Sequence, residues 1–199
     1  VGLDAMNEGA GPDVAALAGQ YGIPVITTYK AKGLLDERHP LALGAAGLSP
    51  LADSHIVPFV QAADLVLCLG YDPIEMRPGW RDIWDPRETR VIDITSAPNH
   101  HYMHQAGVAI VADCAASLAA IGDGIPPRDT WPDGEVDALK AALAAAFPTD
   151  DVWGPAAVID TCRRMLPETT IATADSGAHR ILLSQMWTCA APRGLLQSS

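Results

Sequence analysis

A run of uncharged residues from Leu65 to Gly70 constrains the fold of this 199-residue chain more than any other stretch. It holds five apolar residues and then a glycine, which is typical of a strand buried on both faces of a parallel sheet. A polar turn, Tyr71-Asp72-Pro73, comes directly after it. Ligands bind at the carboxyl ends of strands in open α/β sheets, so Gly70, Tyr71 and Asp72 form the first candidate site.

Strand and helix patterns alternate on both sides of this run. The predicted strands are residues 23–27, 65–69, 90–94 and 108–112, and the predicted helices are 12–21, 51–62 and 115–121. Residues 1–3 resemble the tail of a further strand, and residues 39–47 are expected to form a loop. Alternation of this kind predicts an α/β, three-layer, Rossmann-like domain over residues 1–122, with a parallel sheet of about six strands.

The chain changes character after residue 122. Residues 123–152 are rich in glycine and proline at their start, which predicts a linker, and they contain one isolated helix at 135–147. A second α/β unit is predicted over residues 153–199, with a helix from Pro155, a strand at 170–174 and a helix ending near Met186. We expect this unit to be truncated, because some 45 residues are too few for a stable domain.

Charge and cysteine usage exclude several classes of function. Acidic residues outnumber basic ones 24 to 13, giving a net charge of −11, which argues against a nucleic-acid partner. No run of 18 apolar residues exists, so no membrane-spanning helix is expected. Four cysteines without a CxxC pair predict reduced thiols and a cytoplasmic location. The chain opens at Val1 without a methionine, so we expect a piece of a longer protein.

Several polar residues follow the predicted strands. Thr28, Lys32 and Gly33 could meet an anionic ligand, although two solvated lysines on a loop explain the pattern equally well. The small residues around Gly44 allow close approach by a ligand or by another part of the chain. Asp93 ends a strand, and three histidines, His100, His101 and His104, lie nearby in the sequence. Without an accompanying motif we interpret these histidines as a surface loop, and no metal site is predicted.

A second candidate site lies at Asp175-Ser176-Gly177-Ala178-His179. A catalytic triad is not expected here, because its members come from separate elements and no GxSxG motif is present. A strand followed by a helix N-terminus instead predicts an anion site. The backbone N–H groups of Ser176 and Gly177 would hold the anion, with help from His179.

The order of several short motifs resembles one family. They are Gly22-Ile23-Pro24-Val25-Ile26-Thr27-Thr28, Lys32-Gly33, His39-Pro40-Leu41, Leu43-Gly44, Ala63-Asp64-Leu65-Val66-Leu67, Leu69-Gly70, Val91-Ile92-Asp93, Asp175-x-Gly177-x-His179 and Pro192-Arg193-x-Leu195-x-x-Ser198. The chain is similar to the central domain of thiamine-diphosphate-dependent enzymes of the acetolactate synthase group, followed by the start of their diphosphate-binding domain. Tyr71-Asp72-Pro73-Ile74-Glu75 resembles the catabolic acetolactate synthase branch most closely.

The resemblance implies an intact parent that decarboxylates a 2-keto acid such as pyruvate and then joins the product to a second carbonyl compound. Thiamine diphosphate and Mg²⁺ would be its cofactors, and it would form a homodimer or homotetramer. The activating glutamate and the GDG…N motif of the family would lie outside residues 1–199, so no catalytic residue is expected here and the fragment alone would be inactive. Ser176, Gly177 and His179 would contact the diphosphate, whereas Ala178 stands where the family has a glutamine.

The resemblance also bears on a groove in the first domain. Anabolic members bind FAD with loops like those around Thr28, Lys32, Gly33, Gly44, Gly70, Tyr71, Asp72 and Asp93. The catabolic branch lacks FAD, so flavin is an alternative that we do not favour. Two other functions stay open from the sequence: a non-catalytic module that binds FAD or an adenine nucleotide beside Gly70, and a structural domain that mediates oligomerisation.

Overall fold

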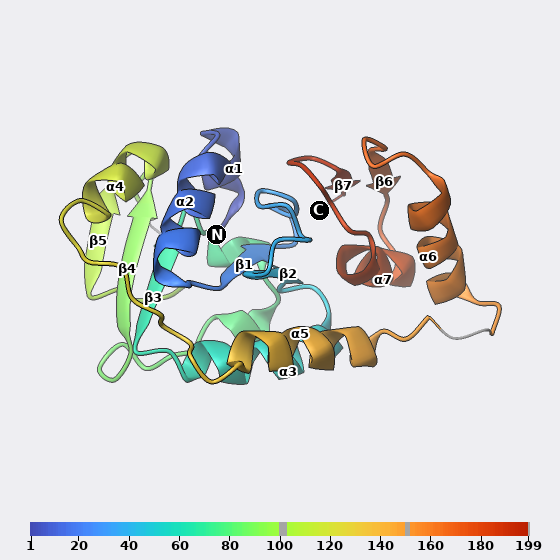
Figure 1. Cartoon of the computed structure of the whole chain (residues 1–199), viewed down its shortest axis with the longest axis horizontal. Helices are drawn as coiled ribbons and strands as arrows, with labels where there is room; N and C mark the ends of the chain where they lie inside the picture. The colour runs from blue at the N-terminus through green and yellow to red at the C-terminus, as the bar shows by residue number, and fades with distance from the viewer. Residues whose placement is uncertain (100–102, 150–151, 199) are drawn as a thin grey trace.

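Parallel strands lie between two layers of helices in the computed structural model, which describes residues 1–99, 103–149 and 152–198 (Figure 1). The helices are α1 (Leu3–Asn7), α2 (Gly11–Tyr21), α3 (Pro50–Gln61), α4 (Cys114–Ile121), α5 (Glu135–Ala146), α6 (Pro155–Met165) and α7 (Ala178–Met186). The strands are β1 (Val25–Thr28), β2 (Ala42–Ala46), β3 (Leu65–Leu69), β4 (Arg90–Thr95), β5 (Val108–Val111), β6 (Ala172–Ala174) and β7 (Leu195–Gln197).

The strands of the first 121 residues form two parallel sheets that face each other edge to edge. One sheet has the order β3-β4-β5, and the other pairs β1 with β2. Val1 and Gly2 lie between them, although they form no strand of their own. The Gly2 N–H donates to Leu69 O at 2.8 Å, and the Thr28 N–H donates to Val1 O at 2.8 Å. The predicted α/β, three-layer architecture is therefore confirmed, and the described residues of this domain form five strands where about six were predicted.

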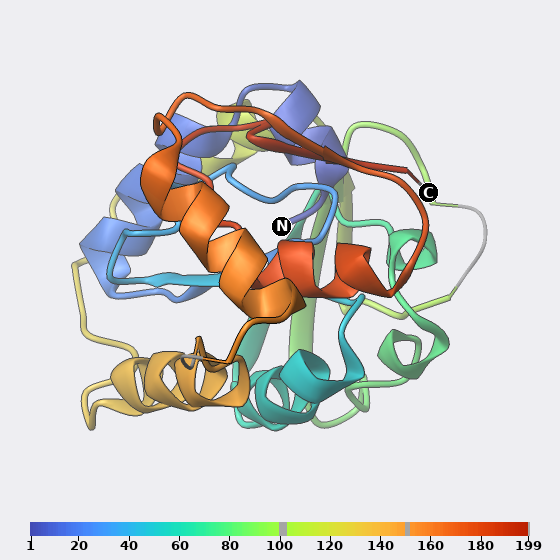
Figure 2. The same ribbon diagram turned by 90° about the vertical axis from the view of Figure 1, so that its right-hand side faces the viewer.

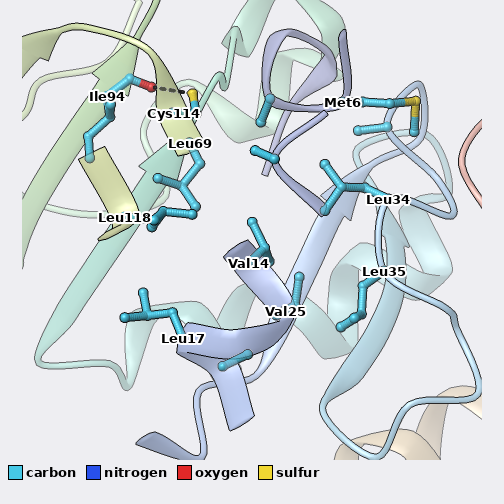
Figure 3. Close-up of a cluster of buried hydrophobic side chains, with 14 of the residues drawn as sticks. Met6, Val14, Leu17, Val25, Leu34, Leu35, Leu69, Ile94, Cys114 and Leu118 are labelled. Carbon is cyan, nitrogen blue, oxygen red and sulfur yellow. Dashed lines mark hydrogen bonds between the residues drawn. The ribbon is translucent and has the colours of Figure 1, made fainter. Parts of the chain in front are cut away.

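Each face of these sheets has its own buried cluster. On one face α1, α2 and α4 contribute to a cluster that includes Met6, Val14, Leu69, Ile94 and Leu118 (Figure 3). On the other face α3 packs Ala52 and Ile56 against β3 and β4, together with the aromatic residues of the loop that follows β3. Burial on both faces explains why the strands read as nearly continuous apolar runs.

Proline and glycine set several helix boundaries as the sequence predicts. Pro12 stands in the first turn of α2, and Gly22 ends that helix in the left-handed conformation, with φ of 66°. Ser49 caps α3, since its side chain accepts a hydrogen bond from the Ala52 N–H at 3.3 Å.

Two local predictions were wrong, those for residues 39–47 and 65–69, and one strand, β7, was not predicted. Residues 39–47 are not a loop, because Ala42–Ala46 form β2 and pair with β1. Leu195–Gln197 form β7, which pairs with β6, so the second unit does contain a two-stranded parallel sheet. The run 65–69 is buried at its carboxyl end only: Leu65 is 48% exposed, whereas Cys68 and Leu69 are buried.

Helix α5 is not isolated in space, although the sequence places it in a linker. It lies beside α3 in both views (Figures 1 and 2), and Val136 and Leu139 pack against Leu43 of β2. Beyond it, α6, α7, β6 and β7 form a second group with its own small cluster around Ile159 and Trp187. Within the described residues, no helix is long and apolar enough to cross a membrane.

Candidate functional site

The turn between β6 and α7 brings together the polar groups that the sequence singled out. Gly177 is the N-cap of α7, with φ of 148°, and because it is a glycine it has no side chain that could cap the helix. The first N–H groups of a helix have no partner within it, so this end of α7 presents free donors at the carboxyl end of a strand. The His179 ring lies over Gly177, where a Cβ would sit 2.7 Å from His179 Cε1.

Strand β7 brings further donors to the same turn. The Ser176 and Ser198 hydroxyl oxygens are 3.3 Å apart, and the Arg180 guanidinium donates to Ser198 O. Arg180 Nε is buried without a hydrogen-bond partner. Sequence reasoning missed Arg180 and used Ser198 only as part of a motif. The pairing of β6 with β7, which the sequence did not reveal, is what brings Ser198 next to Ser176 and Arg180.

One group at this turn opposes an anion. The Asp175 carboxylate accepts a hydrogen bond from the Ser176 N–H at 2.6 Å. This backbone hydrogen bond, followed by one from Ser198, lowers the pKa of Asp175, so its negative charge is favoured. The turn therefore combines a cationic side chain, helix N–H groups and hydroxyls with a single carboxylate.

The predicted central groove is largely filled by the chain itself. Gly70 has φ of 52°, and a Cβ there would lie 2.2 Å from Ala5 N, so α1 occupies the space beside it. Thr28 Oγ1 donates to Glu75 Oε2 at 2.6 Å, and burial raises the pKa of that glutamate. Gly44 lies within β2, where its carbonyl accepts from Thr27 Oγ1 at 3.3 Å. The close approach that Gly70 allows is to the backbone of α1, which leaves a nucleotide beside Gly70 disfavoured.

Gly33 contacts the second group of elements directly, and Lys32 reaches it through Glu37. Lys32 Nζ lies 2.5 Å from Glu37 Oε1, and both side chains are buried. Glu37 Oε2 also accepts the Cys189 N–H at 2.7 Å. A Cβ at Gly33 would lie 2.4 Å from Ala191 O. Their roles in ligand binding stay predictions, but in this structure they join residues 189–191 to the first domain.

The remaining predicted groove residues lie in different environments: Tyr71, Asp72 and Asp93. Asp72 caps a short 3₁₀ turn by accepting the Ile74 N–H at 2.9 Å. Tyr71 is buried, and burial raises the pKa of its hydroxyl strongly. Asp93 Oδ2 lies 3.1 Å from His104 Nε2, and both side chains are almost fully buried.

The surface-loop interpretation is wrong for His104, whose ring packs against Tyr71 and Trp84. His100 and His101 lie outside the described residues. Among the residues that the structure does describe, no group of three or more His, Cys, Asp or Glu could hold a metal ion. The described cysteines are free thiols, and three of them are buried. Burial raises the pKa of Cys68 to about 12, so that thiol is not a reactive nucleophile.

Fold and turn together define an α/β protein in which a strand–helix junction brings together hydroxyl groups, helix N–H groups and one cationic side chain. Comparison with known families sharpens that class. The family model described as "Thiamine pyrophosphate enzyme, central domain" matches residues 1–121, and the chain belongs to that family.

Curated relatives extend the similarity past residue 121. The chain is 28% identical to the acetolactate synthase isozyme 1 large subunit of Escherichia coli (strain K12) over 191 residues, covering 93% of this chain and 33% of that protein. It is 28% identical to the acetolactate synthase large subunit of Parasynechococcus marenigrum (strain WH8102), covering 100% of this chain and 33% of the relative. The sulfoacetaldehyde acetyltransferase of Rhodobacter capsulatus is 29% identical over 68% of this chain and 22% of its own length.

These matches confirm the resemblance to the acetolactate synthase group. The chain spans about a third of the length of the first relatives it matches. Their names do not separate the catabolic branch from the others, so that narrower assignment stays a prediction.

Proposed function

We propose that this chain is part of a thiamine-diphosphate-dependent enzyme of the acetolactate synthase type. Similarity to acetolactate synthase large subunits along nearly the whole chain carries the proposal. The substrate would be a 2-keto acid such as pyruvate, which is decarboxylated and then joined to a second carbonyl compound. Another relative is named a sulfoacetaldehyde acetyltransferase, which supports the broader class of enzymes that transfer a two-carbon acyl group.

The β6–α7 turn fits a diphosphate. Backbone N–H groups of α7, the Ser176 hydroxyl and the Arg180 guanidinium, whose Nε is buried without a partner, would supply donors for anionic oxygens. Ser176, Gly177 and His179 would hold the diphosphate, and Arg180 would add a positive charge. Mg²⁺ would accompany it, because a diphosphate favours a hard cation. When bound, thiamine diphosphate supplies the electron sink for loss of CO₂ from the keto acid.

Location and assembly are part of the same proposal. Three buried free thiols support a reducing compartment such as the cytoplasm. Exposed apolar side chains on the second group of elements, among them Trp153 (78% exposed) and Met165 (77%), support a homodimer or homotetramer in the complete protein. FAD is not favoured, since α1 fills the space beside Gly70.

The decisive experiment measures acetolactate formation from pyruvate by the protein expressed from its complete gene, with and without thiamine diphosphate and Mg²⁺. We expect activity only when both are supplied. A folded protein that forms no acetolactate and binds no thiamine diphosphate would contradict the proposal. Flavin absorbance near 450 nm in the purified protein, on the order expected for one bound FAD, would favour the nucleotide alternative for the central domain.

A matched pair of glycine variants tests the turn itself. Gly177→Ala places a Cβ 2.7 Å from the His179 ring and should weaken binding of thiamine diphosphate about tenfold or more, as loss of a charge-assisted contact does. Gly124→Ala is the control: Gly124 also has a positive φ, of 74°, but nothing lies within 4 Å of its Cβ position. Equal affinities of the two variants would remove the turn from the proposed site.

A further inference from the structure

Strand β5 forms an open edge of the three-stranded sheet. It is the last strand in the order β3-β4-β5, and among the described residues it pairs with β4 alone. It lies at the left-hand margin of the molecule in Figure 1, beside α4. Val108 is 50% and Val111 57% exposed, so the side chains along this edge are open to solvent.

The backbone of β5 points to the open edge at two residues. The Ala112 N–H donates to Thr95 O of β4 at 3.0 Å. Alternate residues of a strand direct their N–H and C=O groups to opposite edges, so Ile110 also faces β4. Ala109 and Val111 therefore present their N–H and C=O groups at the open edge.

The sequence leaves this edge without the usual protection against strand pairing. Natural sheets block open edges with charged side chains, prolines or bulges. Val108-Ala109-Ile110-Val111 has no charge and no proline, and it pairs with β4 in continuous register. From residue 105 to residue 122 the chain has one charged residue, Asp113. Its carboxylate accepts the Ala116 N–H at 2.8 Å as the N-cap of α4, so this charge is engaged within the chain.

A second copy of this chain is the partner that fits such an edge. The chain has a net charge of −11, so two copies repel each other wherever their charged faces meet. A partner with a charged edge would find no counter-charge in residues 105–122 apart from the engaged Asp113. Two copies that meet at β5 instead bring one uncharged edge against another.

Symmetry determines how two such edges can pair. A two-fold axis perpendicular to the sheet makes the two β5 strands antiparallel and keeps both α4 helices on one face, so opposed residues must point to the same face. The outward residues Ala109 and Val111 then pair with each other, which gives about four hydrogen bonds. Ile110 lies on the axis and opposes its own copy. Asp113 lies opposite Gly107 of the other copy, so no like charges are opposed.

We infer that the β5 edge is a self-association surface, at which two copies join their three-stranded sheets into one continuous sheet across a two-fold axis. This surface is separate from the exposed apolar side chains of the second group of elements, and it depends on no assumption about the reaction. Four-residue strands bury little area, so the contact is weak by itself and strengthens any other contact between the same two copies.

Cysteine cross-linking in the protein expressed from its complete gene tests the register. Ile110→Cys places a thiol opposite its own copy, where the Cα atoms would be about 4.5 Å apart, within reach of a disulfide. Ala109→Cys is the matched control, because the two copies of residue 109 would be about 8 Å apart, which is too far. Both variants also carry Cys162→Ser, which removes the exposed thiol of this chain. We expect a disulfide-linked dimer from Ile110→Cys alone.

Sedimentation over about a hundredfold range of concentration gives a second measurement. Val111→Lys should weaken association at least about tenfold, because a lysine at the edge opposes strand pairing. Ile125→Lys is its control, since Ile125 is 50% exposed but lies in the linker. The inference fails if Ile110→Cys gives no cross-link, if Ala109→Cys cross-links as readily, or if the two lysine variants associate equally. A protein that stays monomeric and forms no cross-link would also overturn it, and would leave the edge to a strand of another protein.

Discussion

At the scale of single residues, the buried pair of Lys32 and Glu37 matters most for how the chain is held together. Lys32 is 2% and Glu37 9% exposed, and the carboxylate also binds the Cys189 N–H. A buried ion pair stabilises a fold little more than a buried apolar pair would. Removal of one partner is nevertheless strongly destabilising, because it leaves the other charge buried without a counter-charge. The lysine that the sequence offered as an anion-binding group is therefore engaged with a carboxylate of its own chain.

We expect Lys32→Met to lower the free energy of unfolding by about 3–5 kcal/mol, because it leaves the buried Glu37 carboxylate without its cationic partner. Urea denaturation measures this. Arg87→Met is the matched control, since Arg87 forms the same type of ion pair with Asp85 but is 87% exposed, and its loss should cost no more than about 1 kcal/mol. Similar losses for both variants would show that Glu37 is not buried in solution.

The Val1 amine gives a second prediction at this scale. Burial lowers its pKa from 8.0 in the folded chain, while Cys68, Glu75 and Cys114 act against that shift. Below pH 8 the unfolded chain binds a proton at the Val1 amine more strongly than the folded chain does. The free energy of unfolding therefore falls as the pH drops below 8 and rises as the pH increases toward 8. Acetylation of Val1 should remove this contribution, and the gain from acetylation should be larger at pH 7 than at pH 9 in denaturation curves. An equal gain at both values would contradict a buried amine.

At the scale of elements, Pro12 and Gly22 were enough to predict α2, because they act locally on the backbone, and apolar runs were enough to predict β3 and β4. Strand β2 could not be found this way. Ala42-Leu43-Gly44-Ala45-Ala46 has no β-branched residue and contains a glycine with φ of 79°. Its conformation follows from pairing with β1, a contact between segments that the sequence keeps apart.

Candidate-site residues divide in the same manner. The Ser176–His179 turn is a local strand–helix junction and was predictable. Arg180 and Ser198 meet only because β6 pairs with β7. His104 gave no local signal for burial, since its partner Asp93 lies on β4 and its ring contacts come from the loop after β3.

Helix α5 supports a prediction about elements. Leu139 is 7% exposed and packs with Leu43 and Val136, so Leu139→Ala should cost about 2–4 kcal/mol of unfolding free energy. A helix that merely spans two domains would lose far less. Leu51→Ala in α3 serves as the control, because Leu51 is 49% exposed and its truncation removes little buried area. Thermal or urea unfolding measures the free energy of unfolding of the two variants. Equal, small losses would indicate that α5 is a linker that does not pack stably against β2.

At the scale of the whole molecule, the second group of elements contacts strand β2 and the loop that follows β1. Gln185 Nε2 donates to Ala45 O at 3.0 Å, and Gln197 Nε2 donates to Tyr29 O at 3.4 Å. The Arg180 guanidinium lies over the Tyr29 ring, 5.7 Å from its centroid. The proposed diphosphate turn is thus braced by the first domain, although none of these supporting contacts comes from the predicted groove residues.

Gly33 is the residue through which this bracing can be broken selectively. Gly33→Ala and Gly44→Ala carry the same backbone strain, with φ of 83° and 79°, of about 1 kcal/mol each. Only the Gly33 variant adds a clash, because its Cβ would lie 2.4 Å from Ala191 O, whereas nothing lies within 4 Å of Gly44. Gly33→Ala should therefore speed hydrogen exchange in α7 and β7 beyond any effect of Gly44→Ala. If both variants leave exchange in α7 equal, the two groups of elements are independent in solution, and the turn at Gly177 is positioned by the second group alone.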